Sequence, residues 1–133
     1  MLTTKNWYDG LIEKHAAPVI GFEPNSTEFD RLCNEGPGGC TWLPYFLGNG
    51  LEATFYQTRF PGCSSLYVPD PSGIDLFQTN GSGTPARNIY VVGTERVRTK
   101  RLDDIEECPE VDFIKIDVQS SELDIFKNGI ETL

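Results

Sequence analysis

Residues 111–126 read VDFIKIDVQSSELDIF, and this stretch constrains the fold more than any other. Its first half has apolar residues on both faces of an extended chain, as in a strand that is covered on both sides. Its second half begins an amphipathic segment, residues 121–133, that predicts a helix with Ser121 or Asp124 as a cap. The apolar residues of that predicted helix are Leu123, Ile125, Phe126 and Ile130. A buried strand that leads into a helix is typical of α/β proteins.

A similar order occurs near the start of the chain. Residues 6–16 have helical periodicity, although Gly10 weakens it, and Pro18 ends this predicted helix. The apolar run PVIGFEP then predicts a buried strand. Asn25 offers an N-cap with Glu28 as its capping partner, so a second helix should follow and stop at the breaker GPGG. We expect three residues of this helix to point inward, namely Phe29, Leu32 and Cys33.

The middle of the chain has a different pattern. Residues 41–50 and 51–60 are rich in aromatic residues and are separated by Gly48, Asn49 and Gly50, which predicts a β-hairpin. Residues 61–73 and 78–87 are rich in glycine, proline, serine and asparagine and predict loops. Residues 88–102 predict one long strand or a bent pair, and residues 102–105 predict a short turn. The basic residues between Arg96 and Arg101 alternate along this strand, as on a solvent-exposed face.

The size and charge of the chain narrow its possible functions. Its 133 residues suit a single domain, residues 1–133, and its net charge of −9 opposes non-specific binding to nucleic acid or to anionic membranes. No segment approaches the roughly 18 apolar residues of a membrane span, and no signal peptide is recognisable, so we predict a cytoplasmic protein. The four cysteines have no CxxC spacing and predict free thiols. His15 is the only histidine, so no metal site is predicted.

Acidic residues follow both predicted buried strands. Ligands of open α/β sheets bind beyond the carboxyl ends of the strands, where Glu23 and Asp117 are expected to lie. A carboxylate at the position of Glu23 can hold the two hydroxyls of a ribose, or it can simply be a solvated strand end. Asp117 and Glu122 can line a site, or they can stabilise a helix start. We expect Asp117 to be partly buried, with Lys115 directed to the opposite face.

Five blocks of the sequence, in order, carry a family resemblance: VIGFEPNSTEFDRL, LPYFLGNGLEATFY, PGCSSLYVPD, LDDI and VDFIKIDVQSSELDIFKNGIETL. Over residues 17–133 the chain resembles the FkbM-type methyltransferases. The resemblance implies a Rossmann-like α/β sheet and transfer of a methyl group from S-adenosylmethionine to a hydroxyl of a sugar or small natural product. It also implies that the turn DVQSSE lies beside the methyl-transfer site, with Ser120 where the family usually has glycine.

The resemblance also suggests roles for individual residues. Glu23 corresponds to the acid that holds the cofactor ribose, and we assign Asn25 and Gln119 to the same cofactor site. Asp117 is the first candidate for a catalytic base or an acceptor-orienting group, and Glu122 is the second. The candidate contacts to the acceptor are Ser64 and Ser65.

Two parts of the family pattern are not found in the sequence. The glycine-rich loop of the first strand has no counterpart, and the last strands are also missing, so we expect a truncated domain with an inserted β-hairpin region. Open strand edges would then favour a homo-oligomer. Two alternatives to an enzyme are an oligomeric remnant and a non-catalytic carbohydrate-binding module. The second would use an aromatic surface that contains Trp42, Tyr45, Phe46, Tyr56, Phe60 and Tyr67.

Overall fold

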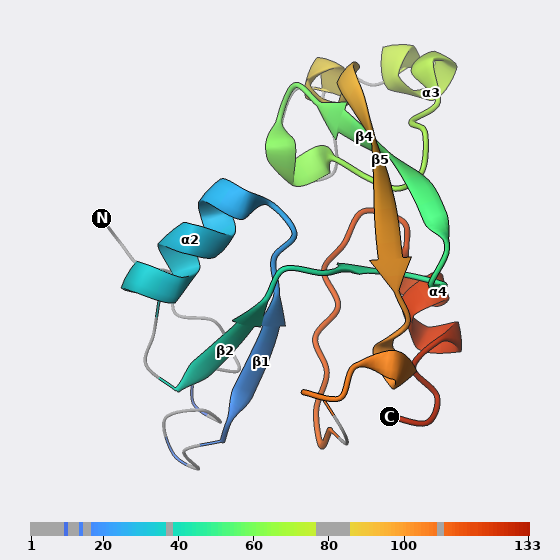
Figure 1. Ribbon diagram of the computed structural model, residues 1–133. Helices are drawn as coiled ribbons and strands as arrows, with labels where there is room; N and C mark the ends of the chain where they lie inside the picture. Colours follow the sequence, from blue (N-terminus) through green and yellow to red (C-terminus); the bar gives the residue numbers. More distant parts are fainter. Residues whose placement is uncertain (1–9, 11–13, 15–16, 37–38, 77–85, 109–110) are drawn as a thin grey trace. The chain divides into compact units, whose positions relative to one another are not determined.

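The computed structural model describes residues 10, 14, 17–36, 39–76, 86–108 and 111–133 (Figure 1). The chain divides into two compact units, Met1–Phe46 and Leu47–Leu133, and each is described by itself. The helix predicted over residues 6–16, which includes His15, lies almost entirely outside the described residues. That part of the sequence analysis therefore stays a prediction.

The first unit contains a strand, a helix and a second strand (Figure 1). These are β1 (Val19–Phe22), α2 (Ser26–Glu35) and β2 (Cys40–Leu43). β1 and β2 are parallel and pair over the full length of both strands. Parallel neighbours need a crossover connection, which α2 provides. The predicted strand and helix are confirmed, whereas β2 pairs with β1 and does not form the first arm of a hairpin.

Packing within this unit depends on Gly21 and Trp42. The Trp42 ring lies directly over Gly21, because a Cβ atom built on Gly21 would be 2.2 Å from ring atom Cζ3. The α2 helix rests on its half-buried residues Phe29 and Leu32. Cys33 is exposed, so the prediction that it points inward is wrong. Helical spacing brings Phe29, Leu32 and Cys33 to one side of α2, but only Phe29 and Leu32 are covered there.

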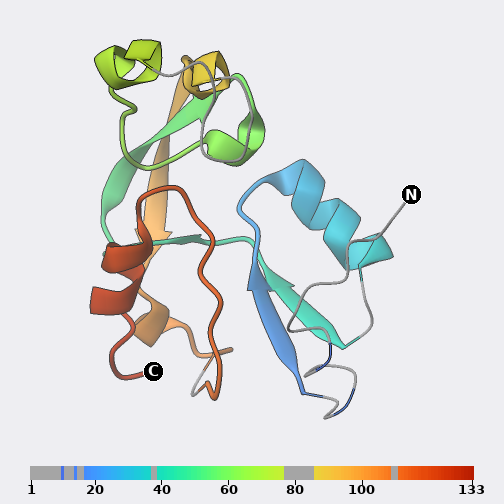
Figure 2. The ribbon, with the colours of Figure 1, turned by 180° about the vertical axis from the view of Figure 1, so that it is seen from behind.

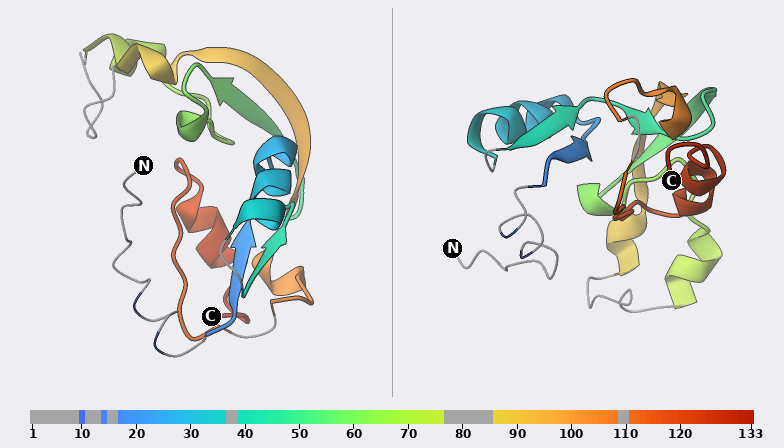
Figure 3. Two further views of the ribbon diagram at one scale, coloured as in Figure 1. Left: turned by 90° about the vertical axis from the view of Figure 1, so that its left-hand side faces the viewer. Right: turned by 90° about the horizontal axis from the view of Figure 1, so that it is seen from below.

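The second unit is built on a three-stranded sheet in the order β3–β5–β4. The strands of this sheet are β3 (Phe46–Leu47), which begins at the last residue of the first unit, β4 (Glu52–Thr58) and β5 (Val91–Lys100). Figure 3 shows β5 as a long curved strand with β4 beside it, and the two are antiparallel. The predicted hairpin is therefore wrong, because β5 lies between the two segments that were expected to pair. The single long strand predicted over residues 88–102 is confirmed by β5.

The glycine turn that was expected to close the hairpin instead wraps around the end of β5. The Gly48 amide donates to the carbonyl of Lys100 at 2.8 Å, and the Gly50 amide donates to Thr99 Oγ1 at 3.0 Å. Gly50 has a φ of +83°, a conformation that glycine adopts without strain. A two-residue β3 offers little pairing of its own, whereas β5 pairs along all of β4.

The alternation of side chains along β5 follows the sequence prediction. Val97 and Thr99 are buried, whereas Arg96, Arg98 and Lys100 are exposed. This confirms that the basic residues form the solvent-exposed face of a strand. A single-residue shift of the strand would reverse both faces, so burial of Val97 and Thr99 fixes the pairing register.

Short helical segments occur in and around the predicted loops. They are the 3₁₀ turns η1 (Pro61–Cys63), η2 (Ala86–Ile89) and η3 (Leu102–Asp104), and the helix α3 (Pro71–Leu76). The turn predicted over residues 102–105 is confirmed by η3. The first residues of α3, 71–73, were expected to be part of a loop, and no structure was predicted for residues 74–76. The helix forms because the Asp70 carboxylate accepts the Ser72 amide at 3.0 Å and Pro71 fits a first helical position.

The C-terminal segment differs most from the prediction. Residues 111–118 form no strand, and Figure 2 shows them as coil leading toward α4 (Glu122–Lys127). A strand needs a neighbour to pair with its backbone, and within the described residues no strand pairs with this segment. Of the four apolar residues assigned to the predicted last helix, only Ile125 is buried. The exposed ones are Leu123, Phe126 and Ile130.

The most deeply buried large apolar side chains of the second unit lie in η3, directly after it and in α4. Leu102, Ile105 and Ile125 are 2–3% exposed. Gly129 follows α4 and lies against Leu102, since a Cβ on Gly129 would be 2.8 Å from Leu102 Cδ2. The described residues thus form a mixed α/β structure with one small parallel sheet and one small mixed sheet.

Candidate functional site

The turn DVQSSE begins with an exposed carboxylate. The Asp117 side chain is 77% exposed, and the Lys115 ammonium donates to its Oδ2 atom at 2.6 Å. Both expectations for Asp117 are therefore wrong: it is not partly buried, and Lys115 does not point away from it. Residues two apart in an extended chain lie on the same side, which places Lys115 beside Asp117. The Oδ1 atom of Asp117 has no partner among the described residues.

Ser120 adopts the conformation that the family's glycine would favour. Its φ is +70°, and it is the only non-glycine residue with positive φ in the described part of the chain. A side chain in this left-handed region costs about 1–2 kcal/mol. The turn therefore keeps a backbone geometry suited to glycine although the sequence supplies serine.

Ser65 is brought to this turn by a hydrogen bond between distant parts of the sequence. Its hydroxyl donates to the carbonyl oxygen of Gln119 at 2.5 Å and accepts the Tyr67 amide at 2.9 Å. Ser65 is buried, with 7% of its surface exposed. The Gln119 side chain is exposed. The serine loop and the turn thus lie together, as the sequence led us to expect.

Ser64 has a different environment from Ser65. Its hydroxyl accepts the backbone amide of Thr58, at the end of β4, at 3.1 Å. Thr58 itself is buried, and its hydroxyl donates to the carbonyl of Phe60 at 2.7 Å. The Ser64 hydroxyl therefore holds the loop against β4, and its predicted role as an acceptor contact stays a prediction.

Two carboxylates lie in the first turn of α4. Glu122 is half-buried, and its side chain makes no hydrogen bond or ion pair with the described residues. Asp124 accepts a hydrogen bond from the Tyr67 hydroxyl at 2.6 Å. The Asp124 carboxylate raises the pKa of Tyr67, because it accepts the phenol proton's hydrogen bond and repels the phenolate. Ser121 precedes the helix, but its side chain makes no capping hydrogen bond.

In the first unit, Glu23 follows β1 and Asn25 caps α2. The Asn25 side chain accepts the Glu28 amide at 3.0 Å, which confirms the predicted N-cap. The reciprocal bond is made by Glu23, whose Oε1 atom accepts the Asn25 amide at 2.9 Å. The predicted role of Glu28 as capping partner is wrong, because its carboxylate pairs with Arg31, which lies one helical turn further on.

This arrangement leaves one oxygen of Glu23 available. Glu23 is half-buried, and its Oε2 atom has no partner within the described part of the chain. A carboxylate oxygen in that state can accept a hydrogen bond from a ligand hydroxyl. Glu23 belongs to the first unit and Asp117 to the second. Because residues 111–118 form no strand, the prediction that Asp117 lies at the carboxyl end of a strand is wrong, whereas Glu23 does follow one. A shared ligand site for the two acids stays a prediction.

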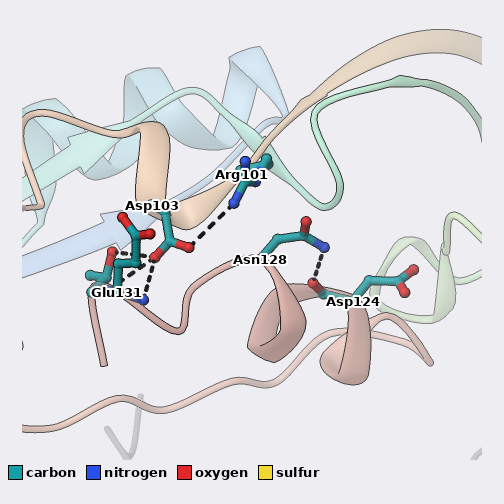
Figure 4. A network of polar contacts seen from close by, with 6 residues as sticks. Arg101, Asp103, Asp124, Asn128 and Glu131 are labelled. Carbon is teal, nitrogen blue, oxygen red and sulfur yellow. Dashed lines mark hydrogen bonds and ion pairs between the residues drawn. The ribbon is translucent and has the colours of Figure 1, made fainter.

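Asp103 is an anchoring residue whose role the sequence analysis did not foresee. Its side chain is 6% exposed, and one oxygen, Oδ1, accepts three hydrogen bonds at 3.0 Å each (Figure 4). The donors are the amides of Glu131 and Thr132 and the Thr132 hydroxyl. The other oxygen lies 3.5 Å from the guanidinium of Arg101. Asp103 thus ties η3 to the segment that follows α4.

Neither a metal site nor a membrane-spanning helix is found among the residues that the structure describes. Among the described residues no group of three or more histidine, cysteine, aspartate or glutamate side chains could hold a metal ion. The structure forms no helix, over the residues it describes, that is long and apolar enough to cross a membrane. All four cysteines are free, and only Cys108 is buried.

One known protein family matches the sequence of this chain. The family model of the methyltransferase FkbM domain matches residues 12–133, which is most of the chain. The chain belongs to the FkbM methyltransferase family. By family it is an S-adenosylmethionine-dependent methyltransferase domain, and its mixed α/β structure is consistent with part of a methyltransferase fold. No curated protein and no solved structure gives a significant match to the sequence.

Proposed function

We propose that this FkbM domain binds S-adenosylmethionine and transfers its methyl group to a hydroxyl oxygen of a sugar or a small natural product. The observation that carries the proposal is the family match over residues 12–133. Bound S-adenosylmethionine would supply an electrophilic methyl group on a sulfonium. The reaction is an in-line displacement, so accurate placement of donor and acceptor provides much of the rate.

The environment of Glu23 supports a role in cofactor binding. A ribose presents two vicinal hydroxyls, and a carboxylate can accept hydrogen bonds from them. Glu23 uses Oε1 for the Asn25 amide and leaves Oε2 for a ligand. Asn25 uses its side-chain oxygen to cap α2, so only its amide nitrogen remains for a cofactor. The side chain of Gln119 is exposed and is therefore available to contact the cofactor.

Asp117 and Glu122 are the residues proposed to act on the acceptor. Lys115 holds one oxygen of Asp117, which orients the carboxylate and leaves Oδ1 for the acceptor hydroxyl. A carboxylate in that position can orient the hydroxyl and receive its proton as the new bond forms. Glu122 is half-buried and has no partner in the described structure, so it is the second candidate.

Calorimetric titration with S-adenosylmethionine tests the proposal. The 133-residue chain and a version extended upstream in the reading frame would be measured, with Glu23→Gln and, as a matched control, Glu35→Gln at the exposed end of α2. The Glu23→Gln side chain would keep an oxygen for the Asn25 amide but would place an amide nitrogen where Oε2 accepts the ribose. We expect at least about tenfold weaker binding for Glu23→Gln and no change for Glu35→Gln. Absence of binding by both wild-type proteins would overturn the proposal.

A carbohydrate-binding module is the second candidate function. Phe60 and Tyr67 are 49% and 47% exposed, and exposed aromatic rings can stack on sugars. The other aromatic residues of that predicted surface are half-buried, which weakens this alternative. A glycan array distinguishes the two functions, because sugar binding without any affinity for S-adenosylmethionine would favour the binding module.

A further inference from the structure

Two hydrogen bonds from one short segment hold the chain on both sides of Ser120, one to the turn DVQSSE and one to α4. Ser65 donates to the carbonyl of Gln119, the residue immediately before Ser120, at 2.5 Å. Tyr67 donates to Asp124, four residues after Ser120, at 2.6 Å. The Tyr67 amide also donates to the Ser65 hydroxyl at 2.9 Å, so the two residues form a local turn that links both contacts. We call this pair of residues the Ser65–Tyr67 clamp.

The clamp is itself fixed to the sheet of the second unit. The Tyr56 amide donates to the Ser65 carbonyl at 2.7 Å, and the Ser65 amide donates back to the Tyr56 carbonyl at 3.1 Å. Tyr56 belongs to β4, which pairs with β5 along its length. The clamp therefore connects the turn to a paired sheet and not to another loop. Movement of the turn would have to break these side-chain bonds or distort the sheet.

The bonding of Ser65 indicates a positioning role. Its hydroxyl has a single proton, which goes to Gln119, and one acceptor site is filled by the Tyr67 amide. The side chain is also buried. It is therefore poorly placed to bind an acceptor molecule, whereas it is well placed to fix the Gln119 carbonyl.

We propose that Ser65 and Tyr67 are positioning residues. They keep Ser120 in its left-handed conformation and so fix the path of the turn at residues 117–122, which directs the Asp117 carboxylate toward the acceptor. The role of the clamp in directing Asp117 rests on the proposed methyl transfer. Its role in fixing the conformation of Ser120 is independent of that function, because it follows from contacts within the second unit. The two hydrogen bonds offset the cost of a positive φ on serine.

A mutational cycle between Ser65 and Ser120 tests the conformational part. Ser120→Gly removes the backbone strain and should raise the folding equilibrium constant about three- to fivefold in the wild-type background, after allowance for the greater flexibility of glycine when unfolded. In a Ser65→Ala background the turn is free to relax, so the same substitution should gain less than about twofold. Equal gains in both backgrounds would overturn the proposal. Ser120→Ala, which keeps Cβ, should give no gain.

Hydrogen exchange of the turn provides a second measurement. Ser65→Ala and Tyr67→Phe should each speed amide exchange in residues 118–124 at least severalfold, because each releases one side of the turn. Ser64→Ala is the matched control, since its hydroxyl bonds to Thr58 and not to the turn. Exchange that changes equally in Ser64→Ala and Ser65→Ala would contradict the clamp. Tyr67→Phe keeps the ring and so serves where Ser65→Ala fails to fold.

Enzyme assays then separate the two parts of the proposal. Tyr67→Phe should lower kcat severalfold while the KM for S-adenosylmethionine stays unchanged, and unchanged kcat would contradict the role in directing Asp117. A wild-type protein without methyl transfer would overturn the proposed function. The cycle and the exchange data would still support or contradict the clamp in that case.

Discussion

Asp103 offers the sharpest test of the structure, because a single buried oxygen accepts three hydrogen bonds. We expect Asp103→Ala to lower the free energy of unfolding by about 3–4 kcal/mol. The Glu131 amide is exposed, so in Asp103→Ala it can donate its hydrogen bond to water, whereas the Thr132 amide and hydroxyl are partly buried. Each buried donor left without an acceptor costs about 1–3 kcal/mol, and the two costs are not fully additive.

Asp103→Asn should cost much less, about 1 kcal/mol, because it keeps an oxygen in the position of Oδ1. It loses only the ion pair with Arg101, whose side chain is 42% exposed. Because water reaches only the Arg101 side of this pair, with Asp103 6% exposed, we take its contribution at the upper end of the range for surface pairs, about 1 kcal/mol. Asp104→Ala is the matched control: Asp104 is adjacent and exposed, and we expect a change within about 0.5 kcal/mol.

The assay is urea unfolding combined with amide exchange at Glu131 and Thr132. The exchange measurement shows whether the lost stability comes from the C-terminal segment that Asp103 holds. Equal destabilisation by Asp103→Ala and Asp104→Ala, or unchanged protection of the two amides in Asp103→Ala, would refute the reasoning. Should Asp103→Ala not fold at all, Asp103→Asn provides the comparison with Asp104→Ala.

Four further predictions concern other parts of the chain. Gly21→Ala should lower the free energy of unfolding by about 1–3 kcal/mol, because the new Cβ would collide with the Trp42 ring. Unfolding would be monitored by tryptophan fluorescence, and an unchanged midpoint would contradict the placement of the ring. Asn25→Ala should cost about 1 kcal/mol in thermal unfolding and Asn25→Asp almost nothing, since only the second keeps the N-cap acceptor; equal losses would argue against the cap. Burial raises the pKa of the Cys108 thiol, so iodoacetamide should modify exposed Cys33 first, as mass spectrometry would show. Equal labelling rates of the two cysteines would contradict the burial of Cys108. The raised pKa also means that the free energy of unfolding falls as the pH rises above about 8.5, because the thiol ionises first in the unfolded chain.

The sequence by itself determined those features that depend on neighbours along the chain. The Asn25 cap, the end of α2 at Gly36 and the alternation of basic residues along β5 could all be predicted from the sequence. Each follows from local geometry: an acceptor for a free amide, a helix breaker and the two-residue period of a strand. Ser120 was noted in advance only because the family resemblance places glycine there, and its positive φ is a finding of the structure.

Only the tertiary structure decided which segments pair and which side chains are buried. Residues 40–43 pair with β1, and β5 inserts between β3 and β4, although local turn signals favoured a hairpin. The apolar run at 111–118 forms no strand, and Asp117 is exposed beside Lys115. The bond from Ser65 to Gln119 joins residues 54 positions apart. The physical reason is that a strand is completed by hydrogen bonds from a partner that can lie anywhere in the chain, and burial depends on what that partner covers.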